Sequence, residues 1–360
     1  MTKRLLLTIG TLVVLLALPA LASATVAFTK ITAPYTTASQ PKNPAIYVAK
    51  NDGTAAHKLA VTGKFPTISP NGKIVAYLVS VHSGGAMVGQ GTLRFVTIKT
   101  GAVVNTKTNC DQPYWAPNSS AVACDTNIPN QGFRLITVKT KGTTTTIAPA
   151  DTNDYFINLR TATWSPDSST LAWSEATQTQ ESSSSQSVLR SMKADGTGPV
   201  LNLGNGNTPA WGPTGLIAFT DDLGQAWTEE SNGSTPKVLT NFRSGKEINP
   251  YSVLTWAPNG KTILGAVNIF TDTRGVANSI TIDAKSGSVK PLGSSNLASK
   301  YSNMVEAVSS DSASALLLYQ PTLSGKNAVG YLRTVSLSTG KSKAFMNNVA
   351  SISVSADWKP

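Results

Sequence analysis

One sequence phrase recurs about every 47 residues, and this repeat constrains the fold more than any other feature of the chain. The phrase consists of an aromatic residue that ends an apolar run, a small residue, Pro, Asn or Asp, another small residue and a second apolar run, and in the first copy Ile68 takes the aromatic place. Copies begin at Ile68, Trp115, Trp164, Trp211, Trp256 and, in degenerate form, Val308, and a partial copy, Asp357-Trp358-Lys359-Pro360, ends the sequence. The central Pro or its equivalent recurs at spacings of 47, 49, 47, 45, 52 and 50 residues. One β-propeller blade of four strands needs about 40–50 residues, so the repeat predicts that fold.

The remainder of each repeat agrees with a four-stranded blade, whose strands we name A to D from the centre outward. The Pro-Asn-Gly or Pro-Asp-Ser phrase is a tight turn between strands A and B, because Pro fixes φ and Asn, Asp or Gly tolerates the next corner. A third β-rich run follows, as at 93–98, 133–138, 279–282 and 331–335, and a Gly-containing turn leads to strand D. No segment shows a long apolar period of 3.6 residues, so we expect an all-β chain with almost no helix. The apolar fraction of 40% excludes a disordered chain.

The two ends of the sequence complement each other within one blade. The C-terminal copy supplies only a strand A, at about 352–358, whereas residues 25–28, 45–48 and 58–61 supply strands B, C and D. One blade is therefore built from both ends of the chain, which closes the ring without an unpaired strand edge at the joint. This arrangement predicts seven blades. The alternative is a six-bladed ring, in which residues 25–28 are only a tail.

Residues 1–24 have the three parts of a secretory signal peptide. Lys3 and Arg4 form a positive start, an apolar stretch covers 5–18, and Ala22-Ser23-Ala24 provides the small residues of a cleavage site. We therefore expect export to the periplasm or the cell exterior and a single propeller domain over residues 25–360. The alternative is an uncleaved anchor, since about 20 apolar residues span a bilayer. No second stretch of this kind occurs, so we expect no membrane span after cleavage.

Export permits disulfides, and Cys110 and Cys124 are the only cysteines. They flank a predicted hairpin centred on 117–119 and would lie nearly opposite each other across it, within the separation that a disulfide needs. We predict a bridge between them. The alternative is two unpaired thiols.

The repeat resembles that of the Tol-B-like propeller family, whose pattern runs Pro-x-Trp-Ser-Pro-Asp-Gly-Lys and continues with Ile-Tyr-Val and Asp-Gly-Gly. The segment Trp164-Ser165-Pro166-Asp167 matches it directly, and Ile46-Tyr47-Val48 followed by Asn51-Asp52-Gly53 is close to it. The resemblance covers essentially all of 25–360. It implies a propeller, a fold that this family uses as a scaffold, as a side domain of peptidases and occasionally in lyases. We expect no counterpart of the α/β domain that precedes the propeller in Tol-B.

One position of the repeat is occupied by tryptophan in five copies, at Trp115, Trp164, Trp211, Trp256 and Trp358. Such a series is a candidate for stacking on carbohydrate. Packing between blades explains it better, because each blade must bury its face on the next one.

In a propeller the A–B and C–D turns share one face, and the B–C and D–A connections share the other. The B–C and D–A connections are expected to be the longer ones, at 79–91, 151–160, 175–186, 241–251, 269–277 and 294–303, so we place any binding site on that face. The candidate ligand-face residues are Tyr155, Phe156, Arg160, Phe242, Arg243, Tyr251, Arg274 and Tyr301. Aromatic and Arg side chains serve at protein interfaces and also stack on glycans. The alternative is ordinary local packing.

The sequence contains no recognisable catalytic constellation, so we expect a protein that is not an enzyme. It lacks a Gly-x-Ser-x-Gly elbow, a P-loop and the His spacings of zinc enzymes. Its two histidines are His57 and His82, of which His82 falls in a predicted B–C loop. We expect no catalytic residue, cofactor or metal ion. The pairs Asp221-Asp222 and Glu229-Glu230 near turns leave calcium as the alternative, without the spacing of an EF-hand.

The charge balance bears on the partner of the protein. The net charge of +11, or +9 without Lys3 and Arg4, attracts anionic polymers and surfaces. The favoured function is an exported, monomeric scaffold of the cell envelope that binds a protein through its face of long loops, with no nucleic-acid partner. The alternatives are a binder of anionic glycan or cell-wall polymer and a polysaccharide lyase with an unrecognised site.

Overall fold

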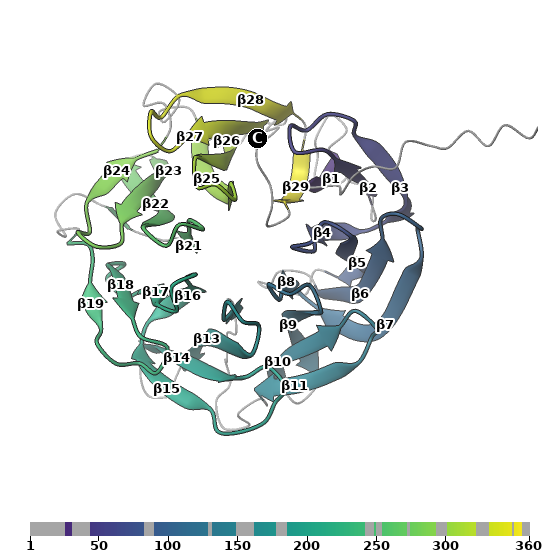
Figure 1. The fold of residues 1–360 in the computed structure, drawn as a ribbon, viewed down its shortest axis with the longest axis horizontal. Helices are drawn as coiled ribbons and strands as arrows, with labels where there is room; N and C mark the ends of the chain where they lie inside the picture. Colours follow the sequence, from purple (N-terminus) through teal and green to yellow (C-terminus); the bar gives the residue numbers. More distant parts are fainter. Residues whose placement is uncertain are drawn as a thin grey trace, which may run out of the picture.

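The computed structural model describes residues 26–30, 44–82, 90–128, 132–148, 162–177, 186–241, 248–249, 254–271, 274–292, 301–321, 331–347 and 349–354. These residues form strands and turns, and no helix occurs among them. Seven antiparallel sheets stand in a ring around a central axis (Figure 1). The predicted seven-bladed propeller is therefore confirmed, and the six-bladed alternative is wrong. No helix long and apolar enough to cross a membrane occurs within the described ranges.

The first four blades each contain four strands, which follow one another from the central axis outward. Blade 1 consists of β29 (Val349–Val354), β1 (Val26–Lys30), β2 (Ala45–Ala49) and β3 (His57–Thr62). Blade 2 consists of β4 (Lys64–Ile68), β5 (Ile74–His82), β6 (Gln90–Thr97) and β7 (Val103–Cys110). Blade 3 consists of β8 (Tyr114–Trp115), β9 (Ala121–Ile128), β10 (Gly132–Lys139) and β11 (Thr144–Ala148). Blade 4 consists of β12 (Ala162–Trp164), β13 (Thr170–Thr177), β14 (Gln186–Lys193) and β15 (Leu201–Asn205).

The last three blades continue the ring, and in blade 6 the innermost strand is divided into two short pieces that both pair with β22. Blade 5 consists of β16 (Asn207–Trp211), β17 (Ile217–Thr220), β18 (Ala226–Glu229) and β19 (Lys237–Val238). Blade 6 consists of β20 (Ile248–Asn249), β21 (Thr255–Trp256), β22 (Thr262–Thr271), β23 (Arg274–Asp283) and β24 (Val289–Pro291). Blade 7 consists of β25 (Tyr301–Val308), β26 (Ser314–Pro321), β27 (Tyr331–Ser336) and β28 (Ser342–Asn347).

Blade 1 joins the two ends of the chain, as the sequence predicts. The last strand, β29, pairs antiparallel with β1, and Phe28 lies opposite Ile352 in this ladder. In Figure 1 the yellow β29 accordingly lies beside the purple β1 at the inner side of the same blade. The strand begins at Val349, three residues earlier than expected from the position of the final repeat. Residues 355–360, including Trp358, lie outside the described residues.

The hydrophobic core is divided among the interfaces between blades. Seven clusters of buried residues occur, and each one combines side chains from two adjacent blades. The cluster between blades 7 and 1, for example, contains Leu316 and Leu332 together with Val26 and Phe28. Each blade is therefore stabilised mainly by burying its two faces on its neighbours, as expected for a repeat architecture.

The repeated tryptophans lie at these interfaces. The indole N–H of Trp115 donates to the carbonyl oxygen of Thr67 in the preceding blade at 3.0 Å. Trp164 donates to the carbonyl oxygen of Tyr114 at 3.0 Å in the same way. Trp256 repeats this contact with Ala210 at 2.9 Å. Packing between blades is thereby confirmed for these three tryptophans.

Trp211 is the exception in the series. Its indole N–H donates to Gly215 in its own A–B turn at 3.1 Å. Its backbone N–H makes the contact to the preceding blade instead, by donating to the hydroxyl of Thr163 at 3.0 Å. The next residue, Gly212, lies against Trp256, and a Cβ atom there would come within 2.7 Å of the indole ring. The Gly in place of Ser or Ala at this turn therefore makes room for a ring of the following blade.

Every described A–B turn has five residues between its strands, and a small residue at its fourth position takes a positive φ. Where this residue is Ser, its hydroxyl oxygen accepts a hydrogen bond from the A–B turn of the preceding blade. Ser119 accepts from the backbone N–H of Asn71 at 3.1 Å, and Ser168 accepts from that of Asn118 at 3.1 Å. Ser312 accepts from Asn259 at 2.9 Å. The left-handed backbone of these serines, with φ of 58–63°, is thus offset by a bond between blades.

The predicted disulfide between Cys110 and Cys124 is confirmed, with a Cα–Cα distance of 5.7 Å. The sequence predicts that this bond crosses a hairpin within one blade, and that part of the prediction is wrong. Cys110 ends the outermost strand of blade 2, whereas Cys124 lies on the second strand of blade 3, so the bond joins two blades. Both cysteines are buried in the cluster between these blades.

The disulfide occupies a position that other blades fill with an aromatic ring. Cys124 corresponds, by strand register, to Tyr77 in blade 2 and Phe219 in blade 5. Each of these rings lies on a glycine at the end of the preceding blade, because a Cβ atom at Gly63 or Gly206 would come within 2.5 Å of it. Ring-on-glycine packing and the disulfide are therefore two solutions to the same contact between blades.

Replacing Cys110 and Cys124 together by Ala is expected to lower the free energy of unfolding by about 3 kcal/mol. The reason is that the bridge closes a loop across a sequence separation of 14 residues in the unfolded chain. Urea denaturation of the wild type and the variant measures the difference. Thiol titration of the unfolded, unreduced wild type serves as the control and should detect no free thiol. Two free thiols per chain would contradict the bridge.

Ser168 offers a test of the bonds between A–B turns. Ser168→Ala loses the bond to Asn118 and keeps the left-handed backbone, so we expect a loss of about 1 kcal/mol in unfolding free energy. Ser168→Gly loses the same bond but relieves the backbone strain, so its stability should lie close to that of the wild type. Urea unfolding of both variants distinguishes them. Equal stability of the two variants would show that the strain is absent.

Candidate functional site

Most of the predicted ligand-face residues fall outside the described part of the chain. Tyr155, Phe156 and Arg160 belong to the undescribed segment 149–161, and Phe242, Arg243 and Tyr251 to the undescribed residues around β20. Whether these side chains come together is therefore a prediction that stays open to test. We call the face of the B–C and D–A connections the long-loop face and the opposite one, formed by the A–B and C–D turns, the short-turn face.

Three residues expected in loops lie in strands. Arg274 begins β23, which is joined to β22 by only two residues, so the long connection predicted at 269–277 is wrong. Tyr301 begins β25, where it pairs with Pro321. His82 ends β5 and pairs with Gln90, so it does not lie in a B–C loop. In each case the strands extend farther toward the long-loop face than the repeat phrase indicates.

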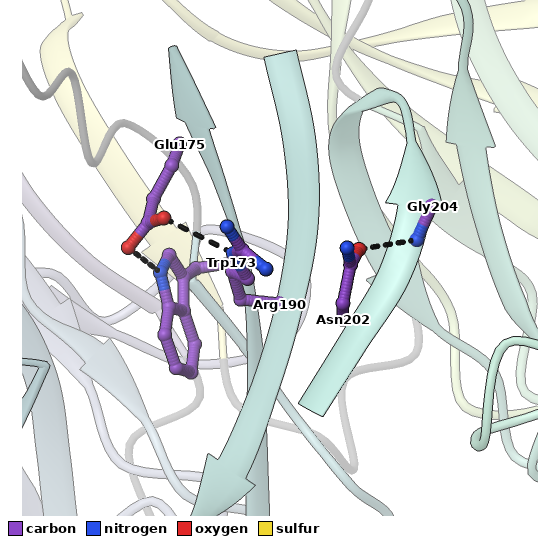
Figure 2. Close-up of polar contacts among 5 residues, drawn as sticks. All are labelled: Trp173, Glu175, Arg190, Asn202 and Gly204. Atoms are coloured by element: carbon purple, nitrogen blue, oxygen red, sulfur yellow. Dashed lines mark hydrogen bonds and ion pairs between the residues drawn. The ribbon is translucent and has the colours of Figure 1, made fainter. Parts of the chain in front are cut away.

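A hydrogen-bonded trio lies in blade 4 near its long-loop end (Figure 2). The indole N–H of Trp173 donates to Oε1 of Glu175 at 3.2 Å, and Nε of Arg190 donates to Oε2 at 3.2 Å. Trp173 is only 1% exposed and packs between blades 3 and 4. Both carboxylate oxygens of Glu175 are thus engaged, one by a core tryptophan and the other by Arg190. Figure 2 also shows Asn202, whose side-chain oxygen accepts from the backbone N–H of Gly204 at 3.0 Å in β15.

Blade 5 repeats the pairing of an indole with a carboxylate at the same end. The indole N–H of Trp227 donates to Oδ2 of Asp221 at 2.9 Å, and Oδ1 of Asp221 accepts from the backbone N–H groups of Leu223 and Gln225. Asp222 accepts from the side-chain amide of Asn207 at 3.0 Å. In the pair Asp221-Asp222, a calcium candidate by sequence, Asp221 therefore closes the B–C turn and Asp222 bonds to the start of β16.

Two aspartates, Asp111 and Asp125, lie beside the disulfide on the long-loop side. Asp111 and Asp125 each follow a cysteine, and the backbone N–H of Asp111 donates to the carbonyl oxygen of Asp125 at 3.0 Å. The backbone N–H of Asp125 donates to Oδ1 of Asp111 at 3.3 Å. Burial, and then the nearby charge of Asp111, raise the pKa of Asp125 well above its usual range. Burial also raises the pKa of Tyr114, with smaller contributions from both aspartates.

This cluster was not foreseen from the sequence. The signal for it is the Cys-Asp dipeptide, which occurs twice, at Cys110-Asp111 and Cys124-Asp125. Once a disulfide joins the two cysteines, the following aspartates must lie close together. Among the described residues, no group of three or more His, Cys, Asp or Glu side chains is arranged to hold a metal ion.

Glu229 is an isolated carboxyl in an interface between blades. It is 3% exposed, and its Oε1 has no hydrogen-bond partner among the described residues. It lies directly opposite Ile217 in the strand pairing, so it shares the side of the blade that packs on blade 4. Burial raises the pKa of Glu229 to about 7. Its neighbour Glu230 is exposed in the C–D turn, so the two acids do not converge on one site.

Exposed lysines collect on the short-turn face. They lie in or directly beside the A–B and C–D turns of six blades, at Lys50, Lys73, Lys99, Lys139, Lys141, Lys193, Lys261, Lys285 and Lys341. The acidic residues of this face are fewer: Asp52, Asp167, Asp195, Glu230, Asp283 and Asp311.

These aspartates hold the turns in which they lie. Asp52, for instance, accepts from the backbone N–H and the hydroxyl of Thr54, and these bonds lower its pKa. The only ion pair within the described ranges is that of Arg190 with Glu175. The lysines of the short-turn face therefore keep their charges free of ion pairs with described residues, and the face is electropositive.

Comparison with known proteins bears on the fold alone. No family model matches the sequence, and no curated protein matches it significantly. Many solved structures share the fold. Tricorn protease matches with a TM-score of 0.58 and 11% identity over 91% of this chain and 35% of its own length, so this chain spans about a third of that protein.

Two further structures have lengths closer to this chain. Oligogalacturonate lyase from Vibrio parahaemolyticus matches with a TM-score of 0.58 and 11% identity, over 91% of this chain and 87% of that one. TolB from Acinetobacter baumannii matches with a TM-score of 0.48 and 15% identity, over 86% of this chain and 78% of that one, which is too low to show a family relationship. At these identities the likeness shows a β-propeller and nothing finer.

The buried carboxyl of Glu229 predicts a stability that falls as the pH rises. Because its pKa is higher in the folded than in the unfolded chain, the native state holds the proton more tightly. The resulting stabilisation is complete below about pH 4.5 and is lost as the pH rises through about 7, by at most about 3 kcal/mol. Urea unfolding of the wild type and Glu229→Gln across this range measures the effect, which the variant should lack. Glu230→Gln, exposed in the next turn, is the matched control and should titrate like the wild type.

Proposed function

We propose that the protein is an exported, non-catalytic binding module that docks a protein partner of the cell envelope through its long-loop face. The observation that carries this proposal is the unequal length of the connections. Every described A–B turn has five residues, whereas the B–C and D–A connections range from one residue to 14. Variable loops on a rigid scaffold are where binding is usually located.

Export is supported by two features. The first 24 residues have the pattern of a signal peptide, and the disulfide between Cys110 and Cys124 belongs to an oxidising compartment. The absence of catalysis is part of the proposal and is supported by the roles of the described carboxylates. Glu175, Asp221 and the aspartates of the short turns are bound to indole, amide or hydroxyl groups that maintain the fold.

A second candidate function is binding of an anionic glycan or cell-wall polymer, and the lysines of the short-turn face favour it. They recur in or beside the turns of six of the seven blades, so a polymer that follows this face meets a new positive charge at each of those six. This candidate differs from the sequence-based expectation in its location, because the charges lie opposite the long loops.

A pull-down with a salt gradient tests both candidates. The full exported protein is immobilised, exposed to an envelope extract of the cells that produce it and eluted up to about 1 M salt, where screening acts beyond about 3 Å. A single protein retained at high salt would support the scaffold. A polymer released at low salt, and not captured by a Lys99→Gln, Lys139→Gln, Lys193→Gln variant, would support the second candidate.

The control in this experiment is Lys107→Gln. Lys107 is equally exposed but lies in the middle of the outer strand β7, away from the short turns, so its loss should leave capture unchanged. Release of shortened, unsaturated sugars from the extract would instead support the lyase alternative and contradict the non-catalytic assignment. An empty column at every salt concentration would contradict both binding functions.

A further inference from the structure

A polar hollow of about 350 Å³ opens where blade 6 meets blade 7 on the short-turn face. Thr262 at the start of β22 and Thr281 and Asp283 at the end of β23 form its walls together with Lys290 of β24. Ser286 and Ser288 of the C–D turn of blade 6 and Leu337 of blade 7 complete the lining. We call this hollow the blade 6–7 pocket.

The carboxylate in the pocket is occupied by its own turn. Oδ1 of Asp283 accepts from the backbone N–H and the hydroxyl of Ser286, both at 2.7 Å, and from the backbone N–H of Lys285 at 3.2 Å. These bonds lower the pKa of Asp283, so it stays ionised and shapes the turn. It is the one acidic side chain in the lining.

Three other polar side chains of the pocket are available to a ligand. The side chains of Thr262, Ser288 and Lys290 make no hydrogen bond or ion pair with the described residues. A second lysine, Lys285, lies near the pocket, because its charge acts on the carboxylate of Asp283. The C–D turn of blade 6 also contacts blade 5, where the ammonium group of Lys237 donates to the carbonyl oxygen of Lys285 at 2.6 Å. The two positive charges of Lys285 and Lys290 therefore exceed the single negative charge of Asp283.

We propose that the blade 6–7 pocket binds one sugar unit, carrying a phosphate or carboxylate group, of an anionic glycan. The hydroxyls of Thr262 and Ser288 match the donors and acceptors of a sugar ring, and the ammonium group of Lys290 matches its anionic substituent. Leu337 offers an apolar surface to the C–H face of the ring. A bare polyanion would use the lysines alone. This proposal rests on the second candidate function, because the lysines of the other blades hold the rest of the polymer.

Blade 7 provides a matched control for Lys290. Thr281 lies opposite Lys290 in blade 6 and donates its hydroxyl to the carbonyl oxygen of Lys290 at 3.5 Å. In blade 7, Thr334 lies opposite Lys343 and donates to its carbonyl oxygen at the same distance. Lys343 is exposed like Lys290 but does not line the pocket. The two lysine positions thus differ mainly in that only Lys290 lines the pocket.

Titration calorimetry of the full exported protein at about 0.1 M salt tests the proposal with phosphomannan, alginate and inorganic polyphosphate, and with neutral mannan as the blank. Lys290→Gln should weaken binding of phosphomannan, alginate or both about tenfold, and Lys343→Gln should change it less than twofold. Thr262→Val should weaken glycan binding about fivefold and leave polyphosphate binding unchanged. Binding of phosphomannan alone would identify the anionic group as phosphate, and binding of alginate alone as carboxylate.

Three results would overturn the proposal in distinguishable ways. Equal losses of affinity for Lys290→Gln and Lys343→Gln would show that the pocket is not a specific sugar site. Polyanion binding by the short-turn face would then remain supported. Polyphosphate binding without glycan binding would show the same. If no polymer binds, both the sugar site in the pocket and the second candidate function are contradicted. If Thr262→Val lowers the melting temperature, Ser288→Ala in the exposed turn replaces it, with the same expected loss for glycans alone.

Discussion

Burial of one blade against the next is the interaction on which the rest of this structure depends. A single blade has two apolar faces and can bury neither of them alone. The seven core clusters each combine side chains of two blades, so stability is distributed around the ring, blade by blade. The pairing of β29 with β1 completes the last interface and makes all seven equivalent in kind.

This constraint explains why chemically different residues occupy corresponding positions. Tyr77 and Phe219 pack on glycines of the preceding blade, and Cys124 forms a disulfide at the corresponding place. The indole N–H groups of Trp115, Trp164 and Trp256 donate to the preceding blade. At Trp211 the backbone N–H does so instead, by donating to the hydroxyl of Thr163. What the repeat preserves is therefore a contact between blades and not a particular side chain. The buried Glu229 shows the tolerance of this arrangement for a polar group.

The repeat phrase allows the positions of the blades to be predicted from the sequence. It does not allow the ends of strands to be predicted where no such phrase occurs. The blade number, the joined termini and the packing of the tryptophans follow from the spacing of the Pro turns. The ends of strands on the long-loop face carry no such mark, so Arg274, Tyr301 and His82 were expected in loops, and Cys110 was placed in the wrong blade. The contact of Asp111 with Asp125 joins two blades and depends on the disulfide. The lysines, by contrast, were visible in the repeated turns as Lys-Thr-Gly and Lys-Ser-Gly.

The connections on the two faces of the ring differ in regularity, and this difference bears on function. The A–B turns keep one length, because Ser or Asx side chains cap them and bonds such as that of Asn118 with Ser168 link them around the ring. Lysines lie in or beside the A–B or C–D turns of six blades, and such a recurring charge suits a ligand that is itself a repeating polymer. The B–C and D–A connections, by contrast, range from one residue to 14 in length. They are suited to recognise an irregular surface, such as that of one protein partner.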